Sequence, residues 1–446
     1  MVRLKKSSEV KRYIASNEAM GEILDFAAAL SRDMLVCGAN VERVSLAVYK
    51  ITHAYGLHDV CPYILSNYVS ISARSSDGTY GSRQMKVPPM NVDLERLRAL
   101  NRLSYSICEE VPPPFMLSGR LKEGCRTRRY PWQVVLGIRA LAMACMSLFF
   151  GADLKDMIFT AVLVVLLNLL SKQIEMIAPD RMLVNVVYML LASFLAVSGG
   201  RVHLCSSPAA VITTIIMVYL PGFQLVNAAR NLFCGNEMNG ILQLIKALFE
   251  TIALAVGVIL VLMSVADVGI KIPAVSYPAW FLVLLSFLIS SGIGVGFGII
   301  GKDILLAGLC GALSRVVLLI AMAHTQERLV YILAATLVSS LFAEIVVTYR
   351  HEPSTYLIYP SIIPLIPGDL FFYMILGICF RNEEMIRTNG SQCAYALIGL
   401  SVGFMLSSMI AVHIRRLNFV RAGGILPHML HRQAREEDAA QAGNGR

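Results

Sequence analysis

Apolar residues are distributed very unevenly along this chain of 446 residues. Residues 1–133 contain most of the polar sequence, whereas nearly everything from Val134 to Ile414 is apolar. Read with a window of about 19 residues, the apolar region predicts ten membrane-spanning helices. They lie near 134–150, 154–171, 182–198, 208–231, 241–265, 278–300, 303–323, 329–348, 356–380 and 393–414. The pattern predicts an all-α polytopic membrane protein that carries a soluble domain at its N-terminal end.

Within the polar region the hydrophobic period changes from that of a helix to that of a strand and back again. The predicted elements are helices at 18–37, at 41–55 and from near Asn91, and strands around Val69–Ala73 and Gln84–Val87. Glycines directly after the first two helices are typical stop signals. These elements predict a small cytoplasmic α+β domain over residues 1–117.

Charge adds an orientation to this picture. Only 15% of the residues are charged, against roughly 25% in soluble domains. A basic linker, 118–133, precedes the first span, and Arg415, Arg416 and Arg421 follow the last. Basic flanks mark the cytoplasmic side and can contact anionic lipid, so both termini are expected there. These clusters account for the net charge of +9 without nucleic acid. Residues 417–446 are expected to form a cytoplasmic tail.

Two of the predicted spans are interrupted in the same way. Pro221-Gly222 recurs as Pro367-Gly368 at an offset of 146 residues, and Asn-Glu follows each proline fifteen residues later. These matches predict two five-helix repeats, 134–270 and 271–416. An odd number of spans reverses the second copy, which gives the inverted repeat of many secondary transporters. The alternative is that both prolines are ordinary kinks packed against neighbouring helices.

A proline inside a helix leaves the carbonyl four residues earlier without its donor, here that of Met217 or Ile363. Half-helix ends also present backbone dipoles. The free carbonyls can accept hydrogen bonds from the ammonium group of a small zwitterion, and the N–H groups at the half-helix ends can donate to its carboxylate. The candidate substrate pathway consists of the interruptions and nearby polar groups: Thr213, Pro221, Gly222, Gln224, Asn227, Arg230, Pro367, Gly368 and Asp369.

Ionisable residues inside membrane spans are costly and usually functional. Glu344 and Asp369 are candidates for a proton-carrying carboxylate, since burial raises a carboxyl pKa. Arg315 is the competing partner, which would form a structural ion pair with one of them. No residue pattern predicts a catalytic constellation, a metal site or a cofactor, so an enzyme is not expected.

Several motifs make the chain resemble the full-length form of the threonine/serine exporter family. In the soluble part these are CGANVERV (37–44), PYILSNYVSIS (62–72) and MNVDLERLRALNRLS (90–104); in the membrane part, PGFQLVNAARNLFCGNEMNG (221–240) and PLIPG (364–368). The resemblance implies a cytoplasmic domain joined to ten spans in the cell membrane (plasma or inner). It also implies export of threonine and serine by the proton motive force. A related split form is associated with succinate export.

The chain departs from the family's pattern at two positions. Asn231 stands where the resemblance implies an acidic residue, and Gln243 stands where it implies arginine. If that acid carries protons in relatives, this protein uses another carboxylate or couples differently.

A secondary active exporter of threonine and serine is therefore the favoured function. The alternatives are an exporter of a small dicarboxylate such as succinate, a non-transporting membrane scaffold or regulator, and a channel. The expected partners are the small substrate, protons and lipid, and a homo-oligomer is compatible with the sequence.

Overall fold

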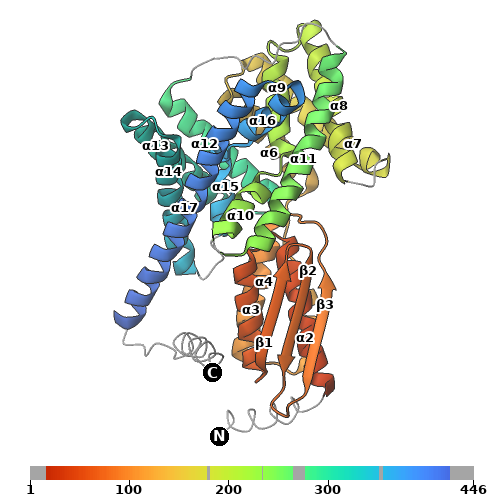
Figure 1. The fold of residues 1–446 in the computed structure, drawn as a ribbon, viewed down its shortest axis with the longest axis vertical. Coiled ribbons are helices and arrows are strands. Elements are labelled where there is room, and N and C mark those ends of the chain that lie inside the picture. Colours follow the sequence, from red (N-terminus) through yellow and green to blue (C-terminus); the bar gives the residue numbers. More distant parts are fainter. Residues whose placement is uncertain (1–16, 178–180, 234, 265–276, 351–354, 422–446) are drawn as a thin grey trace.

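The computed structural model describes residues 17–177, 181–233, 235–264, 277–350 and 355–421. A bundle of long helices forms the membrane part, and a small domain with one sheet lies at one end of it (Figure 1). The predicted boundary between the two halves, 270/271, and most of the predicted tail lie outside the described residues.

The small domain opens with two helices, a three-stranded antiparallel sheet and a third helix. Their bounds are α2 Asn17–Val36, α3 Val41–Ala54, β1 His58–Leu65, β2 Tyr68–Arg74, β3 Tyr80–Lys86 and α4 Leu94–Glu110. The sheet order is β1-β2-β3. Alternation places Val69, Ile71 and Ala73 of the central strand in the core. The predicted helices and the central strand are confirmed.

Strand β1 was not predicted. It is an edge strand in which only Ile64 is buried, and Pro62 removes one backbone donor. Its register with β2 is also irregular between His58 and Cys61. A strand with so few buried positions carries almost no alternating signal.

The segment predicted as a basic linker contains ordered structure. After the short 3₁₀ turn η1 (Pro114–Met116), α5 spans Leu117–Gly124. Leu117 and Leu121 of α5 are buried against the small domain. The chain therefore stays packed on this domain until shortly before the first membrane helix.

Among the described residues, the membrane part has eight helices long and apolar enough to cross a bilayer, and two further pairs of shorter helices joined at a bend. The long helices are α6 Trp132–Phe149, α7 Leu154–Ile177, α8 Arg181–Arg201, α11 Glu237–Met263, α12 Ala279–Gly296, α13 Asp303–His324, α14 Arg328–Arg350 and α17 Glu383–Arg421. The bent pairs are α9 Pro208–Tyr219 with α10 Gly222–Phe233, and α15 Thr355–Ile362 plus η2 Ile363–Leu365 with α16 Gly368–Phe380. Counted with each bent pair as one span, the described residues contain ten candidate spans.

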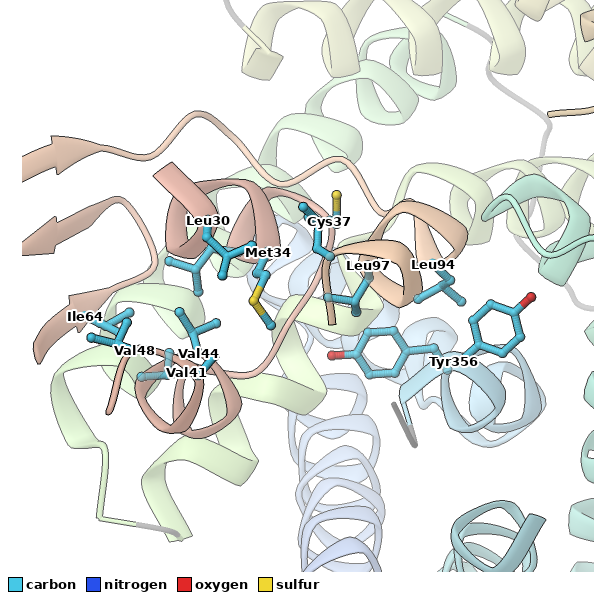
Figure 2. Packing of buried hydrophobic residues seen from close by; sticks show 14 of the residues in the cluster. Leu30, Met34, Cys37, Val41, Val44, Val48, Ile64, Leu94, Leu97 and Tyr356 are labelled. Carbon is cyan, nitrogen blue, oxygen red and sulfur yellow. The ribbon is translucent and has the colours of Figure 1, made fainter. Parts of the chain in front are cut away.

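One apolar core runs from the small domain into the membrane part. Figure 2 shows Tyr356 of α15 beside Leu94 and Leu97 of α4, in the same cluster as Met34 of α2 and Cys37, which directly follows α2. The Tyr356 side chain is fully buried. Because this core is continuous, the small domain is docked on the membrane helices by apolar packing as well as by polar contacts.

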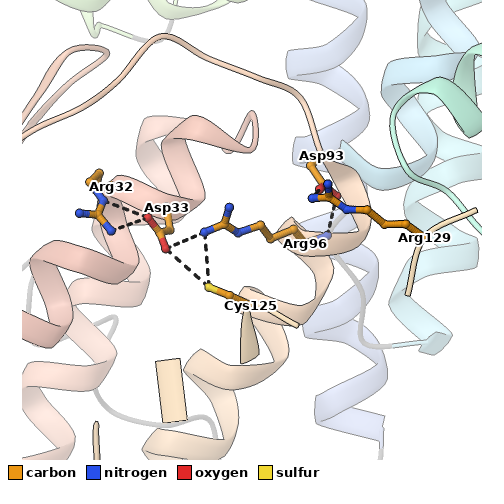
Figure 3. Close-up of polar contacts among 6 residues, drawn as sticks. All are labelled: Arg32, Asp33, Asp93, Arg96, Cys125 and Arg129. Atoms are coloured by element: carbon orange, nitrogen blue, oxygen red, sulfur yellow. Dashed lines mark hydrogen bonds and ion pairs between the residues drawn. The ribbon is translucent and has the colours of Figure 1, made fainter. Parts of the chain in front are cut away.

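A polar cluster holds the ends of the small domain's helices together (Figure 3). Asp33 accepts hydrogen bonds from Arg32 and Arg96, each at 2.9 Å, and Arg96 also contacts the Cys125 sulfur. Burial raises the pKa of the Cys125 thiol and raises that of Cys37 to about 12. Both thiols are therefore protonated at neutral pH, and the Cys125 thiol also contacts Asp33 at 3.6 Å.

Candidate functional site

Both predicted interruptions are breaks in a helix, and they share one backbone turn. The helix axis bends by 56° between α9 and α10 and by 52° between α15–η2 and α16. At the first break the Gly222 N–H donates to the Leu220 carbonyl at 2.7 Å, and at the second the Gly368 N–H donates to Ile366 at 2.9 Å. The proline between them, which lacks an N–H, occupies the middle of this tight turn.

The correspondence extends beyond the turns at the same offset of 146 residues. Leu220 and Ile366 have φ/ψ of −63°/133° and −66°/125°. The bond from Asn236 N–H to the Asn231 carbonyl is matched by that from Asn382 to Gly377, both at 2.9 Å. The two interrupted segments therefore repeat one local structure.

The two breaks also pack against each other. A methyl group added to Gly222 would lie 3.1 Å from a side-chain carbon of Ile366, and one added to Gly368 would lie 3.1 Å from Leu220. Residue 222 thus faces residue 366, and residue 368 faces residue 220. This reciprocal exchange is what a two-fold relation between the segments requires.

A cavity of about 340 Å³ lies at this meeting point. Its lining includes every residue from Met217 to Gln224, together with Ile363, Ile366 and Gly368 of the second break. The Ile363 carbonyl, predicted to lose its donor, accepts a hydrogen bond from the Ile366 N–H at 3.2 Å. The open backbone at the cavity is therefore mainly that of the first break.

The small domain supplies one wall of this cavity. Met90, Asn91 and Val92, from the segment between β3 and α4, are among the lining residues. Directly afterwards, the Leu94 N–H donates to the Phe297 carbonyl at the end of α12, at 2.8 Å. The soluble domain therefore touches the cavity itself and is not tethered at a distance from it.

Side chains of the second interrupted helix are bound directly by the small domain. Tyr356 Oη donates to Glu95 at 3.0 Å and accepts from Arg98 Nη1 at 3.3 Å. Arg98 also forms an ion pair with Asp303, at the start of α13, at 3.0 Å. Tyr359 Oη donates to the Gly38 carbonyl at 3.1 Å and accepts from Asn227 Nδ2 of α10 at 3.3 Å. One tyrosine hydroxyl thus joins both interrupted helices to the small domain.

The two departures from the family's pattern contact each other. Asn231 Nδ2 donates to Gln243 Oε1 at 3.2 Å, and Gln243 Nε2 donates to Ser66 Oγ at 2.9 Å. Ser66 lies in the turn between β1 and β2, and Asn239 of α11 accepts from its N–H at 2.8 Å. An amide pair therefore stands where the resemblance implies an acid and an arginine, and it links α10 and α11 to the soluble domain.

The structure does not bring the other predicted pathway residues together at one cavity. Gln224 lines the cavity, and its buried Oε1 has no hydrogen-bond partner among the described residues. Thr213 is not among the residues that line the cavity, and its hydroxyl is 2.9 Å from that of Tyr373 on α16. Asn227 and Arg230 instead line a separate cavity of about 20 Å³, which Glu344 of α14 also lines.

The three residues predicted for proton coupling or an ion pair lie apart. Arg315 lies over the Phe149 ring at 4.6 Å, and no described carboxylate forms an ion pair with it. Asp369 lies in the first turn of α16, next to the second break but not among the residues lining the cavity. Glu344 is buried beside Arg230 at the small cavity.

Sequence reasoning did not assign Arg139 on α6, Asn185 on α8 or Asn91 of the small domain to the site, although all three line the cavity. The signal for Arg139 was its charge, since it lies within a predicted span and such residues usually face a cavity. Asn185 has no comparable signal in a single sequence.

Comparisons with known proteins agree over nearly the whole described chain. A family model described as "Putative threonine/serine exporter" matches residues 25–265, and one described as "Threonine/Serine exporter, ThrE" matches residues 282–410. A "Probable threonine/serine exporter" of Mycobacterium tuberculosis is 23% identical over 414 residues, which cover 88% of this chain and 77% of that protein. No solved structure matches significantly.

Proposed function

The chain belongs to the threonine/serine exporter family, a family of multi-pass membrane transporters and not of enzymes, and from this premise we propose that it exports threonine and serine from the cytoplasm by secondary active transport driven by the proton motive force. One observation carries the proposal: two matched interruptions meet at a cavity large enough for a small amino acid. A membrane scaffold has no use for such a cavity.

Two inverted repeats of five spans account for the arrangement of the breaks. In Figure 1, α9 and α16 lie far from the small domain, whereas α10 and α15 lie closer to it. The first interrupted helix therefore runs towards the small domain and the second runs away from it. The matched turns and the reciprocal glycine contacts support the same two-fold relation.

The small domain is proposed to be cytoplasmic and to form the gate on that side. Arg126, Arg128 and Arg129 lie between it and α6, as the positive-inside rule requires for a cytoplasmic flank. Met90, Asn91 and Val92 lie over the cavity and would have to move for substrate to enter from the cytoplasm. Alternating access would then couple their release to rocking of the repeats.

Proton coupling is proposed to use Glu344 or Asp369. Glu344 lies beside Arg230, and Asp369 follows the second break directly, so each could respond to a change at an interrupted helix. Asn231 is a weaker candidate in this chain, because an amide does not take up a proton near neutral pH.

Counterflow in proteoliposomes tests the proposal. Wild-type protein is expected to exchange labelled threonine against unlabelled threonine or serine, and an imposed proton gradient is expected to drive net transport. Pro221→Ala and Pro367→Ala should each slow exchange at least about tenfold by restoring helix at a break. Pro278→Ala, at the exposed start of α12, is the matched control.

Three results would contradict parts of the proposal. Wild-type protein that moves neither threonine nor serine would exclude the substrate. Full exchange in both proline variants would exclude the breaks as the site. Unchanged dependence on the pH gradient in both Glu344→Gln and Asp369→Asn would exclude these carboxylates as coupling groups.

A further inference from the structure

We propose that Arg139 binds the carboxylate group of the transported substrate, an inference that rests on the cavity being the transport site. Arg139 lies in the interior of α6, on the lining of the cavity at the two breaks. It also lines a neighbouring cavity of about 390 Å³, nearer to the small domain. The guanidinium group of Arg139 therefore lines both of these neighbouring cavities.

Arg139 is the single charged residue among the described residues that line the cavity at the breaks. The polar side chains that accompany it are uncharged: Asn91, Asn185, Tyr219 and Gln224. The remaining lining is apolar side chains and the backbone of the breaks. The cavity thus has a positive charge and no described carboxylate to balance it.

The neighbouring cavity contributes one carboxylate, that of Asp93, and it is already bound. Asp93 forms an ion pair with Arg129 and accepts a hydrogen bond from the Arg96 N–H at 2.9 Å as the cap of α4 (Figure 3). Within the described part of the chain, no ion pair joins Arg139 to an acidic side chain. A ligand carboxylate that enters the cavity can therefore form the direct ion pair that Arg139 lacks among the described residues.

A cation within a membrane helix is expensive to hold without an anion, so a ligand carboxylate that enters the cavity gains an unusually strong partner. The planar guanidinium can donate two parallel hydrogen bonds to a carboxylate. A substrate ammonium would meet only neutral acceptors, among them the unpartnered Gln224 Oε1 and the backbone at the first break. The carboxylate should therefore be obligatory and the ammonium only favourable.

A competition panel in the counterflow assay tests this ranking on the wild-type protein. L-Threoninol lacks the carboxylate of threonine, and 3-hydroxybutyrate lacks its ammonium. We expect 3-hydroxybutyrate to compete with labelled threonine, and threoninol to be at least about 30-fold weaker than threonine. Succinate serves as the dicarboxylate. Threoninol that competes as well as threonine would overturn the proposal.

Substitution assigns the effect to the residue. Arg139→Gln should raise the half-saturating threonine concentration at least about 30-fold, and Arg139→Lys should keep part of the affinity because it keeps the charge. Arg201→Gln, at the exposed end of α8, is the matched control and should behave as wild type. An unchanged half-saturating concentration in Arg139→Gln would overturn the proposal.

A binding measurement separates failure of this inference from failure of the proposed function. Thermal stabilisation of the purified protein by threonine, 3-hydroxybutyrate and succinate needs no transport. Carboxylates that stabilise the wild type but not Arg139→Gln would support the proposal even if threonine and serine were not exchanged. Carboxylates that stabilise both proteins equally would overturn it, whatever the transport assay shows.

Discussion

At the first interruption the cavity is lined by every residue from Met217 to Gln224, whereas the second interruption contributes Ile363, Ile366 and Gly368. Contacts with the small domain are concentrated at the second interrupted helix instead. Every residue of α15 is buried, and its two tyrosines bond to the small domain. The first interruption therefore mainly faces the cavity, whereas the helix that leads into the second interruption is held by the soluble domain.

This difference shows how a repeated backbone can acquire two tasks. The turn itself depends only on the Pro-Gly pair and is nearly identical in both halves. The side chains that follow it, and the elements packed on it, are not constrained by the repeat. We infer that the first interruption mainly contacts substrate, while the second mainly transmits the position of the gate.

The largest expected effect comes from the contact between the two breaks. Gly222→Val and Gly368→Val would each force a side chain into space that Ile366, Met217 or Leu220 occupies. Transport in the counterflow assay should fall at least about tenfold in both. Gly137→Val is the control, because nothing lies within 4 Å of an added methyl there. A normal rate in both variants would show that the breaks do not meet during transport.

The ion pair between Arg98 of the small domain and Asp303 of α13 should contribute more to stability than an exposed ion pair does. The side chains of Arg98 and Asp303 are 13% and 6% exposed. Arg98 also pairs with Glu95 at 3.4 Å, so Asp303→Asn weakens this nearly buried group of charges and should cost about 2 kcal/mol. Glu110→Gln, which breaks the exposed pair with Arg120, should cost less than about 1 kcal/mol. Thermal unfolding of the purified protein measures both. Equal losses of stability in the two variants would mean that the Arg98–Asp303 pair does not help to hold the small domain on the membrane helices.

A double-mutant cycle tests what the Asn231–Gln243 pair does beside the first interruption. Asn231→Asp and Gln243→Arg should each lower stability by about 1–2 kcal/mol, and the double variant should recover most of it as an ion pair. The pH dependence of transport should be the same in all four proteins if this pair only positions α10. A shifted pH dependence in Asn231→Asp alone would instead give residue 231 a role in coupling.

The smallest effect is a change in labelling at the domain junction. The pKa of Cys37 is raised to about 12 by burial, so its reactive thiolate increases only as the pH rises towards that value. At pH 8 maleimide should modify the exposed Cys61 first. Tyr359→Phe removes the bond to Gly38 and should speed labelling of Cys37 several-fold while leaving Cys61 unchanged. An unchanged rate at Cys37 would mean that Tyr359 does not hold the domain in place.

Much of the fold could be predicted from local patterns. The long apolar runs, the helices of the small domain and the two Pro-Gly interruptions each carry a signal within a few dozen residues. Strand β1 and helix α5 could not be predicted in this way. The first is an edge strand with one buried residue, and the second was obscured by its basic neighbours.

The candidate site was only partly predictable for a different reason. Pro221, Gly222, Gln224 and Gly368 line the cavity, and their place in a substrate pathway stays a prediction. Arg139 reaches the same cavity from α6, and Asn91 from the soluble domain, through contacts that no periodicity encodes. The roles predicted for Glu344, Asp369 and Arg315 stay predictions.

The hydrogen bond from Tyr359 to Gly38 joins residues 321 positions apart in the chain. During synthesis the N-terminal domain emerges first, and its core is not complete until α15 has been inserted near the end of translation. A nascent or truncated chain must therefore keep the apolar surface around Leu94 and Leu97 uncovered until then. A chain truncated before α15 therefore cannot complete the core that its own N-terminal domain begins.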